Sequence, residues 1–321
     1  MMRGRWIALL ALLLTGLPAL AQDWPARPMR VVVPFSAGSI GEIMLRVIAP
    51  PMEAKLGQRF VIDTKPGAAG NIGTAEVARA APDGYTLLLA PTANYAVNMH
   101  IFKEKAVDSF TAFDPIAMIA EAPLIAVVGP GVSSRTLKDL VDTIRANPGK
   151  LNYGSPGTGS PTHLTGALLS QMTGNGLVYV PYKGTPPMMQ ALMANDIQVV
   201  FPTLGTAIGA IKGGKVRVLA VTAKQRLPEL PEVPTSAEAG FPEMLAGNWW
   251  VISAPRGIES RIVERLETEV RAALDDPAIR KRIIELGHVP VGLTPAETVA
   301  FLKSESARFK GIVERGGIKP D

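Results

Sequence analysis

Residues 29–42 read MRVVVPFSAGSIGE, an apolar run followed by a loop of small residues. The run at 29–35 predicts a short buried strand, and the loop after it predicts the start of a helix. Small residues let a ligand approach bare backbone amides, and the free N–H groups of a helix start favour an anion. The stretch therefore indicates an α/β unit whose loop is either an ordinary βα turn or part of an anion site.

Two further loops repeat this pattern. Residues 65–73 (KPGAAGNIG) follow a predicted strand at 59–63, and residues 154–163 (GSPGTGSPTH) follow a predicted strand at 151–154. An ordinary turn would explain any one of these loops, but their recurrence favours a shared function. The sequence therefore predicts a pocket for carboxylates built from the three loops.

The first residues predict an export signal. Arg3 and Arg5 form a basic start, residues 6–20 are nearly all apolar, and residues 19–21 (ALA) form a small-x-small cleavage site. A membrane anchor is the competing interpretation, but the apolar run is shorter than the roughly 20 residues that a span needs. We expect cleavage after Ala21 and a mature protein in the periplasm.

Composition excludes several classes of function. The 321 residues include no cysteine, which removes disulfides, a thiolate nucleophile, cysteine-ligated metals and a lipid-bearing cysteine. The formal net charge is +5, or +3 without Arg3 and Arg5, and no run of basic residues occurs. We therefore expect no nucleic-acid partner.

Apolar runs and helical stretches alternate through most of the chain, which predicts an α/β protein with largely parallel sheets. The expected strands lie at 29–35, 59–63, 85–90, 124–128, 151–154, 178–181, 199–201, 216–222 and 249–254. The C-terminal third predicts helices at 259–275, 278–286 and 296–313.

Capping residues mark several helix starts. Thr136 and Thr294 are followed three residues later by an acid, as in a capping box, and Asp276 precedes a proline at a first helical turn. The helix expected from Gly41 to Leu56 contains Pro50-Pro51, which predicts a kink or a split there.

Two points on the chain predict domain crossings. The alternation restarts near residues 122–131 and gives way to C-terminal helices near 240–250. The expected organisation is a signal peptide at 1–21, a discontinuous first domain at 22–125 plus 247–321, and a second domain at 126–246. The crossings would act as a hinge, and the pocket would lie between the domains at the carboxyl edges of the strands.

Seven strings resemble those of the tripartite tricarboxylate transporter receptors, the Bug-type periplasmic solute-binding proteins, in the same order. They are VVVPF at 31–35, PGAAGNIG at 66–73, APDGYTLL at 81–88, ANPGKLNY at 146–153, the loop and helix start at 155–164, VPYKG at 180–184 and PEVPTSAEAG at 231–240. The resemblance extends over essentially the whole mature chain.

The resemblance implies a type II periplasmic binding fold, with two α/β domains that close on an organic acid. It also implies that backbone amides of the three loops, with Ser155 and Thr158, hold the ligand carboxylate, partly through ordered water. The expected ligand-binding residues are Phe35, Ser36, Ala37, Ser39, Glu42, Ala68, Ala69, Gly70, Thr92, Asn94, Ser155, Gly157, Thr158, Gly159, His163, Tyr182, Lys183, Pro202 and Thr203. We expect a monomer without cofactor, metal or catalytic residues, which delivers its ligand to integral membrane permease subunits.

Three positions depart from the family pattern. Glu42 stands where an aspartate is expected. Pro202 stands where many relatives carry an aspartate that can face a polar group of the ligand, which argues against an amino-acid ligand. Trp249-Trp250 doubles a single tryptophan, either as an apolar wall or as packing; packing is favoured.

Two rival functions stay open at this stage. An exported serine hydrolase would use Ser155 and His163, although no candidate serine lies in Gly-x-Ser-x-Gly. A periplasmic sensory partner would use the same closed shape as a transport receptor. His163 is a capping, pocket-wall or ligand residue, and Lys183 either pairs with a second carboxylate or is solvated. Aliphatic di- and tricarboxylates and aromatic acids all remain open as ligands.

Overall fold

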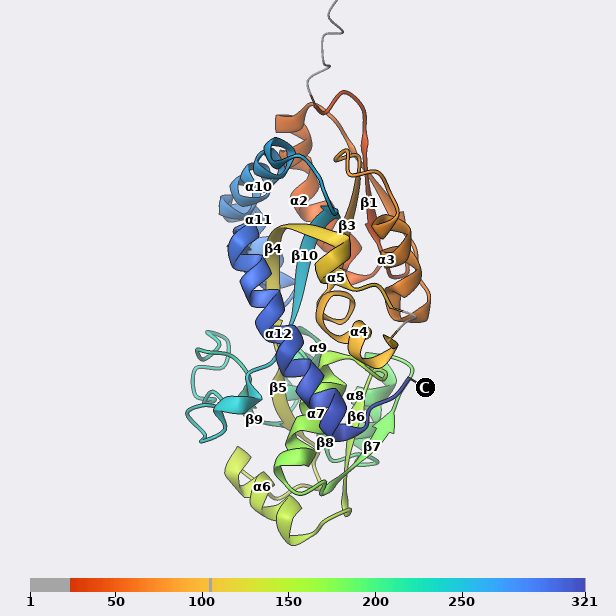
Figure 1. Cartoon of the computed structure of the whole chain (residues 1–321). Coiled ribbons are helices and arrows are strands. Elements are labelled where there is room, and N and C mark those ends of the chain that lie inside the picture. Colours follow the sequence, from red (N-terminus) through yellow and green to blue (C-terminus); the bar gives the residue numbers. More distant parts are fainter. Residues whose placement is uncertain (1–23, 104–105, 321) are drawn as a thin grey trace, which may run out of the picture.

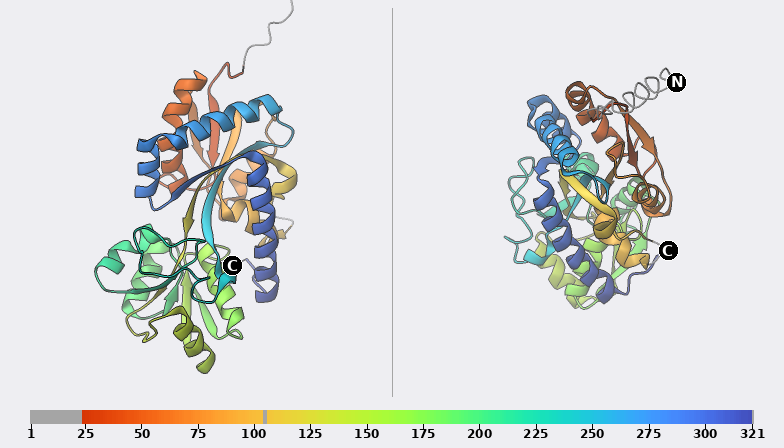
Figure 2. Two further views of the ribbon diagram at one scale, coloured as in Figure 1. Left: turned by 90° about the vertical axis from the view of Figure 1, so that its left-hand side faces the viewer. Right: turned by 45° about the horizontal axis from the view of Figure 1, so that its top comes forward.

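The computed structural model describes residues 24–103 and 106–320 (Figures 1 and 2). The predicted signal peptide and its cleavage site lie outside the described residues. Within the described part, every helix is too short or too polar to cross a membrane.

The chain forms two lobes, one above the other in Figure 1, and each lobe is built around one sheet. Lobe 1 holds six strands in the order β11-β4-β10-β3-β1-β2, and lobe 2 holds five in the order β7-β6-β8-β5-β9. The strands are β1 (Met29–Val33), β2 (Phe60–Thr64), β3 (Thr86–Pro91), β4 (Phe113–Pro123), β5 (Ile125–Val128), β6 (Leu151–Ser155), β7 (Leu177–Pro181), β8 (Val199–Val200), β9 (Arg217–Val221), β10 (Gly247–Pro255) and β11 (Val289–Leu293).

Helices cover both sheets (Figure 2). They are α2 (Ile40–Leu56), α3 (Asn71–Ala78), α4 (Asn98–Ile101), α5 (Ser109–Ala112), α6 (Leu137–Ala146), α7 (Pro161–Met172), α8 (Thr185–Ala194), α9 (Leu204–Lys212), α10 (Ser260–Asp275), α11 (Pro277–Glu285) and α12 (Pro295–Gly316). Shorter helical turns are η1 (Ala68–Gly70), η2 (Ala93–Val97) and η4 (Pro242–Met244).

The α/β prediction is confirmed, but the sheets are mixed and not largely parallel. β1 pairs in parallel with β2 and β3, and β6 pairs in parallel with β7 and β8. The strands that lead from one lobe to the other, β4, β5, β9 and β10, pair antiparallel with their neighbours. The βαβ pattern accounts for the outer half of each sheet only, because the crossing strands are joined without a covering helix.

Two strands and one helix differ from the sequence prediction. β4 and β11 were missed because Pro115 in β4 and Pro290 in β11 weigh against a strand. Of the expected kink or split in α2, the split is wrong, since the helix runs unbroken through Pro50 and Pro51. Its buried face, including Leu45 and Ile48, packs within lobe 1, and this packing outweighs the lost hydrogen bonds.

The predicted helix starts are confirmed. Complete capping boxes open α6, at Thr136 with Asp139, and α12, at Thr294 with Glu297. The Asp276 side chain accepts the first free N–H groups of α11. These local signals succeed because each depends on residues only three positions apart.

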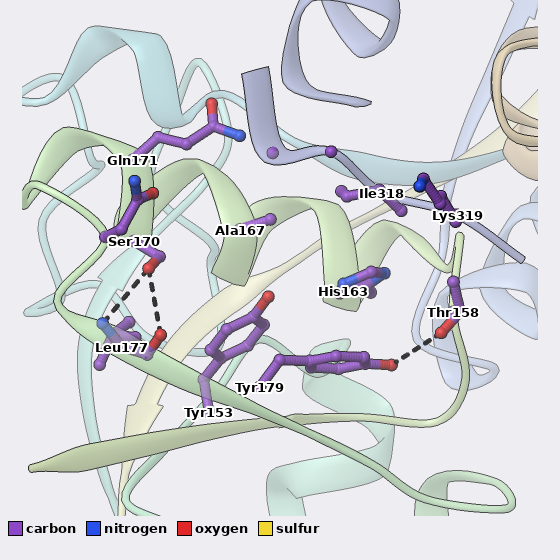
Figure 3. Close-up of a pocket in the computed structure, with 13 residues that line it drawn as sticks. Tyr153, Thr158, His163, Ala167, Ser170, Gln171, Leu177, Tyr179, Ile318 and Lys319 are labelled. Atoms are coloured by element: carbon purple, nitrogen blue, oxygen red, sulfur yellow. Dashed lines mark hydrogen bonds between the residues drawn. The ribbon is translucent and has the colours of Figure 1, made fainter. Parts of the chain in front are cut away.

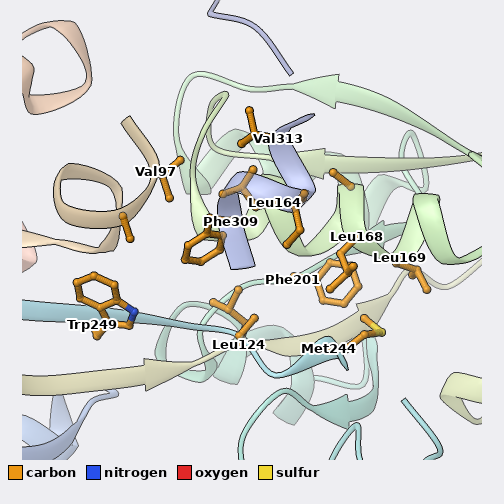
Figure 4. Packing of buried hydrophobic residues seen from close by; sticks show 14 of the residues in the cluster. Val97, Leu124, Leu164, Leu168, Leu169, Phe201, Met244, Trp249, Phe309 and Val313 are labelled. Atoms are coloured by element: carbon orange, nitrogen blue, oxygen red, sulfur yellow. The ribbon is translucent and has the colours of Figure 1, made fainter. Parts of the chain in front are cut away.

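One hydrophobic cluster belongs to both lobes (Figure 4). It joins Val97 and Trp249 of lobe 1 to Leu164 and Phe201 of lobe 2, and Phe309 of α12 packs among them. We call this set the shared cluster. In Figure 1, α12 descends from lobe 1 onto α7 of lobe 2. The lobes are therefore joined by packed side chains as well as by the chain itself.

Both tryptophans of β10 are buried, which confirms the packing interpretation. Trp249 is 1% exposed and lies in the shared cluster, whereas Trp250 is 2% exposed and lies in a second cluster within lobe 1. Successive residues of a strand point to opposite faces, so each tryptophan fills a different side of the sheet.

Candidate ligand-binding site

The residues predicted to bind ligand lie at the carboxyl ends of neighbouring strands in both lobes. In lobe 1 they follow β1, β2 and β3, and in lobe 2 they follow β6, β7 and β8. We call residues 34–39, 65–70 and 156–160 loops 1, 2 and 3. A Cβ placed on Gly159 of loop 3 would lie 3.0 Å from Ile101 Cδ1, so loop 3 packs against α4 of lobe 1.

Loop 1 is supported by an acid of its own helix. The Glu42 carboxylate accepts the Gly38 N–H at 2.7 Å and is bound by Arg46, with Nε at 2.8 Å. The Gly38 hydrogen bond, followed by Arg46, holds the pKa of Glu42 below its usual range. Glu42 is 8% exposed. The Glu42 carboxylate therefore supports loop 1 from within. Ser36 and Ala37 are exposed, and the buried Ser39 Oγ has no hydrogen-bond partner among the described residues.

Two aromatic rings pack where loop 1 meets α2. The Trp250 ring lies against the first turn of α2, where a Cβ on Gly41 would overlap it. Phe35 meets the same ring edge to face, with centroids 6.4 Å apart. Gly41 is thus required for close packing, and Phe35 is fixed at the start of loop 1.

Loop 2 has an unusual backbone. Four successive residues, Gly67, Ala68, Ala69 and Gly70, have φ values of 125°, 48°, 54° and 85°. Alanine rarely adopts positive φ, and two in a row indicate stored strain. Ala68 and Ala69 are exposed, and no acceptor for either N–H is present among the residues that the structure describes. Ser36 and Ala37 of loop 1 are likewise exposed with no acceptor for their N–H groups among the described residues, so loops 1 and 2 each offer an open pair of amide donors.

Buried amides hold loop 2 in this conformation. The Ala69 carbonyl accepts from Asn98 Nδ2 at 2.9 Å and, more weakly, from Asn94 Nδ2 at 3.4 Å. Asn98 also donates to Asn71 Oδ1 at 2.9 Å. The Gly70 N–H, which shares a peptide with the Ala69 carbonyl, donates within the loop to Gly67 O at 2.9 Å. Asn94, predicted as a ligand residue, is 2% exposed and supports the loop from behind.

Thr92 also has a structural partner. Its Oγ1 accepts the Trp249 N–H at 3.0 Å and lies 3.3 Å from Asn248 Oδ1. It is fully buried. The structure thus ties Thr92 to β10, at the crossing between the lobes.

Most backbone N–H groups of loop 3 have hydrogen-bond acceptors in the loop or in the residues next to it. Ser155 Oγ accepts the Gly157 N–H at 3.1 Å, and His163 Nδ1 accepts the Gly159 N–H at 3.1 Å. Tyr179 Oη lies 2.8 Å from Ser155 Oγ and 3.3 Å from Thr158 Oγ1. The His163 ring stacks on Tyr179 with centroids 4.0 Å apart. Side chains behind the loop therefore set its shape.

These contacts engage the groups that a hydrolase would use. Ser155 is fully buried and bonded to Gly157 and Tyr179, and His163 Nδ1 is used by a backbone amide. A serine nucleophile needs an accessible hydroxyl in contact with its base. The local geometry favours a structural role for both residues.

The other predicted residues of lobe 2 surround loop 3. The Tyr182 N–H donates to Ser155 O at 2.9 Å, and burial raises the pKa of its phenol. Lys183 is exposed on the next position. Pro202 is buried and its carbonyl accepts the Ile125 N–H at 2.9 Å, with Thr203 half-buried beside it. Lys183 is the cation in this group, and its exposure leaves it open to solvent.

Two cavities lie under the C-terminal segment, and the first of them borders loop 3. One, of about 360 Å³, is lined by Thr158, His163, Tyr179 and the segment at 316–319 (Figure 3). The other, of about 390 Å³, lies between α4 and the end of α12. Thr158 and His163 are the predicted ligand residues that line the first cavity.

Sequence reasoning missed Asn98 and Tyr179. Asn98 fixes loop 2 and Tyr179 fixes loop 3, each from an element outside the loop. A sequence signal existed for Tyr179 alone, since alternation along β7 places it on the same face as Tyr153 of β6, its register partner.

Comparisons with known proteins bear on the family and the fold. A sequence profile described as the tripartite tricarboxylate transporter family receptor matches residues 44–318. The structure of R. palustris Rpa4515 with adipate is 34% identical, with a TM-score of 0.79 and coverage of 93% of this chain and 100% of that one.

Two more solved structures are similar. MatC from Rhodopseudomonas palustris with bound malate is 30% identical, with a TM-score of 0.75 and coverage of 90% of this chain and 100% of that one. The periplasmic binding protein BugD is 30% identical, with a TM-score of 0.75 and coverage of 93% and 100%. These likenesses confirm the predicted two-lobed periplasmic-binding fold.

Proposed function

The chain belongs to the tripartite tricarboxylate transporter receptors, and from this premise we propose that it captures a small organic carboxylate between its lobes by hinge closure. The open amides of Ala68 and Ala69 carry the proposal. A carboxylate that accepts charge-assisted hydrogen bonds gains about 1.5–3 kcal/mol from each. Two such bonds give about 3–6 kcal/mol, whereas micromolar binding needs about 8 kcal/mol after ordering costs, so contacts from loop 1 and lobe 2 would supply the rest.

The proposed ligand class is a short acid with one or two carboxylates. Adipate and malate, in the two relatives named above, are both dicarboxylates. Loop 2 would hold one carboxylate, and Lys183 of lobe 2 would pair with the other. Because Glu42 already uses the Gly38 amide, loop 1 would contribute its exposed residues Ser36 and Ala37 in place of a full amide cradle.

We propose the domain boundaries expected from the sequence, 22–125 plus 247–321 and 126–246. The sheet orders support them, since β4 and β10 lie in lobe 1 whereas β5 and β9 lie in lobe 2. The protein would bind without converting its ligand, because Ser155 and His163 are engaged in loop 3.

Export with cleavage after Ala21 would place the receptor in the periplasm, where BugD is also described. Its partner would be a membrane permease, and the same closed shape would serve a sensory receptor. The mass of the protein recovered from a periplasmic extract tests the cleavage site.

A thermal-shift screen tests the binding function. The mature chain is heated with adipate, malate, citrate or benzoate, and a ligand at 100 times its dissociation constant adds about 2.7 kcal/mol of stability. Gly70→Leu should abolish the response, because Gly70 has a φ of 85° and a Cβ there meets Asn94 at 2.5 Å.

Gly149→Leu is the matched control, since Gly149 has a φ of 75° with open space around it and lies in lobe 2 away from the loops. Both variants should lose stability through backbone strain, but only Gly149→Leu should keep the ligand response. The proposal fails if no acid shifts the native protein, or if Gly70→Leu responds normally.

A further inference from the structure

The two segments that connect the lobes meet at one buried side chain. β4 continues into β5 through Leu124, and β9 reaches β10 through residues 222–246. Leu124, Thr222 and Ala246 lie together at this crossing and are 1%, 1% and 4% exposed. Solvent therefore cannot replace a hydrogen bond lost there.

Thr222 is bonded to both connecting segments through its backbone. Its N–H donates to Leu124 O at 2.9 Å, and its carbonyl accepts the Ala246 N–H at 2.9 Å. A strand pair would supply the same bonds with any residue in this position. The backbone alone thus gives Thr222 no special role.

The Thr222 hydroxyl adds a second set of bonds. Oγ1 accepts the Leu124 N–H at 3.1 Å, and it lies 2.8 Å from Leu124 O and 2.6 Å from Ala246 O. A hydroxyl has one proton, and Leu124 O and Ala246 O each already accept a backbone N–H, so the proton is assigned to the nearer oxygen, Ala246 O at 2.6 Å. The Leu124 N–H also donates directly to Ala246 O at 3.3 Å, so the hydroxyl reinforces, with two shorter bonds, a link that the backbone makes weakly.

The same crossing carries part of the proposed binding site. The Ile125 N–H donates to Pro202 O at 2.9 Å, and Leu124 forms an isolated bridge with Thr203. A change in the path of the first segment at Leu124 would therefore move the loop after β8. The hydroxyl of Thr222 acts on both the angle between the lobes and this loop.

We infer that Thr222 is a positioning residue that fixes the axis about which the two lobes close. Without its hydroxyl, the crossing gains conformational freedom in the ligand-free protein, and a ligand must remove that freedom when it binds. The inference rests on the proposed function in one respect, that the lobes close on a ligand, but its main test needs no ligand.

The main test measures the distance between the lobes in the ligand-free protein. Since the chain has no cysteine, Arg79→Cys in lobe 1 and Gln190→Cys in lobe 2, both exposed, allow one spin label on each lobe. Thr222→Val keeps the shape of the side chain and removes the hydroxyl. The distribution of label-to-label distances, measured by double electron–electron resonance, should broaden in Thr222→Val. It should recover its native width in Thr222→Ser.

Thr173→Val is the matched control. Thr173 is 6% exposed, and its Oγ1 bonds to Leu169 O at 2.9 Å and Ser170 O at 3.0 Å, entirely within lobe 2. A purely structural role for Thr222 would lower the melting temperature of both valine variants and leave both distributions unchanged. Equal widths in native, Thr222→Val and Thr173→Val proteins would overturn the inference.

A second measurement uses the native protein, in case the Thr222→Val variant does not fold. In native protein, the Leu124 and Ala246 amides should exchange with deuterium as slowly as the central strands of the sheets. Fast exchange at these two amides would show that the crossing opens freely and would also overturn the inference.

The ligand arm separates this inference from the proposed function. With the acid that gives the largest thermal shift, Thr222→Val should raise the dissociation constant roughly tenfold while Thr173→Val leaves it unchanged. If no acid binds the native protein, the proposed function fails, and the distance measurement still decides the role of Thr222.

Discussion

Replacing Ala68 and Ala69 by glycine should raise the stability of the protein and lower its affinity for the ligand. Their φ values of 48° and 54° lie in the left-handed region, which costs an alanine about 1–2 kcal/mol. Glycine removes this cost but loses about 0.5–1 kcal/mol through its freer unfolded chain. The net gain for the pair is about 1–2 kcal/mol, or a rise in melting temperature of roughly 2–3 °C for a mature chain of about 300 residues.

Binding should change in the opposite direction, because a glycine loop must be ordered when a carboxylate docks on its amides. Calorimetry of unfolding and of binding gives both values on the same samples. Ala75→Gly, within the regular helix α3, is the control and should lose about 0.5–1 kcal/mol of stability. A double variant that is no more stable than the native protein would refute the strain assigned to loop 2.

Three more perturbations follow from the site and the core. Glu42→Gln should reduce the loss of unfolding free energy between about pH 5 and 3, measured by unfolding at a series of pH values. The Glu42 pKa is lowered in the folded protein, so its carboxylate contributes stability above the pKa of the unfolded chain, and this stability is lost as pH falls through the pKa of the folded protein. Gly41→Ala should cost about 1–3 kcal/mol in urea unfolding, since its Cβ overlaps the Trp250 ring. Phe309→Ala should cost about 3–5 kcal/mol, since the ring is 1% exposed in the shared cluster.

The sequence predicts those parts of the structure that depend on neighbouring residues. Each small-residue loop after an apolar run does join a strand to a helical turn, and the capping boxes of Thr136 and Thr294 open the helices expected from them. Prolines misled the prediction at β4, β11 and α2, because the packing that tolerates them comes from distant elements.

The supports of the site could not be predicted in this way. Asn98 reaches Ala69 across 29 residues, Tyr179 reaches Ser155 across 24, and Thr222 reaches Leu124 across 98. No periodicity links such pairs, since only the tertiary fold brings them into contact. The sequence therefore indicates where a ligand would bind, whereas the structure shows which side chains hold those loops in shape.

The shared cluster limits how the molecule can be divided. A fragment cut at the crossings to isolate lobe 2 would present Leu164, Leu168 and Phe201 to water, because their packing partners Trp249 and Phe309 would be left behind. Such a truncated piece would be prone to aggregate during expression. Biosensor designs based on this scaffold are better served by inserting a reporter into an exposed turn of the intact chain than by splitting it into two halves.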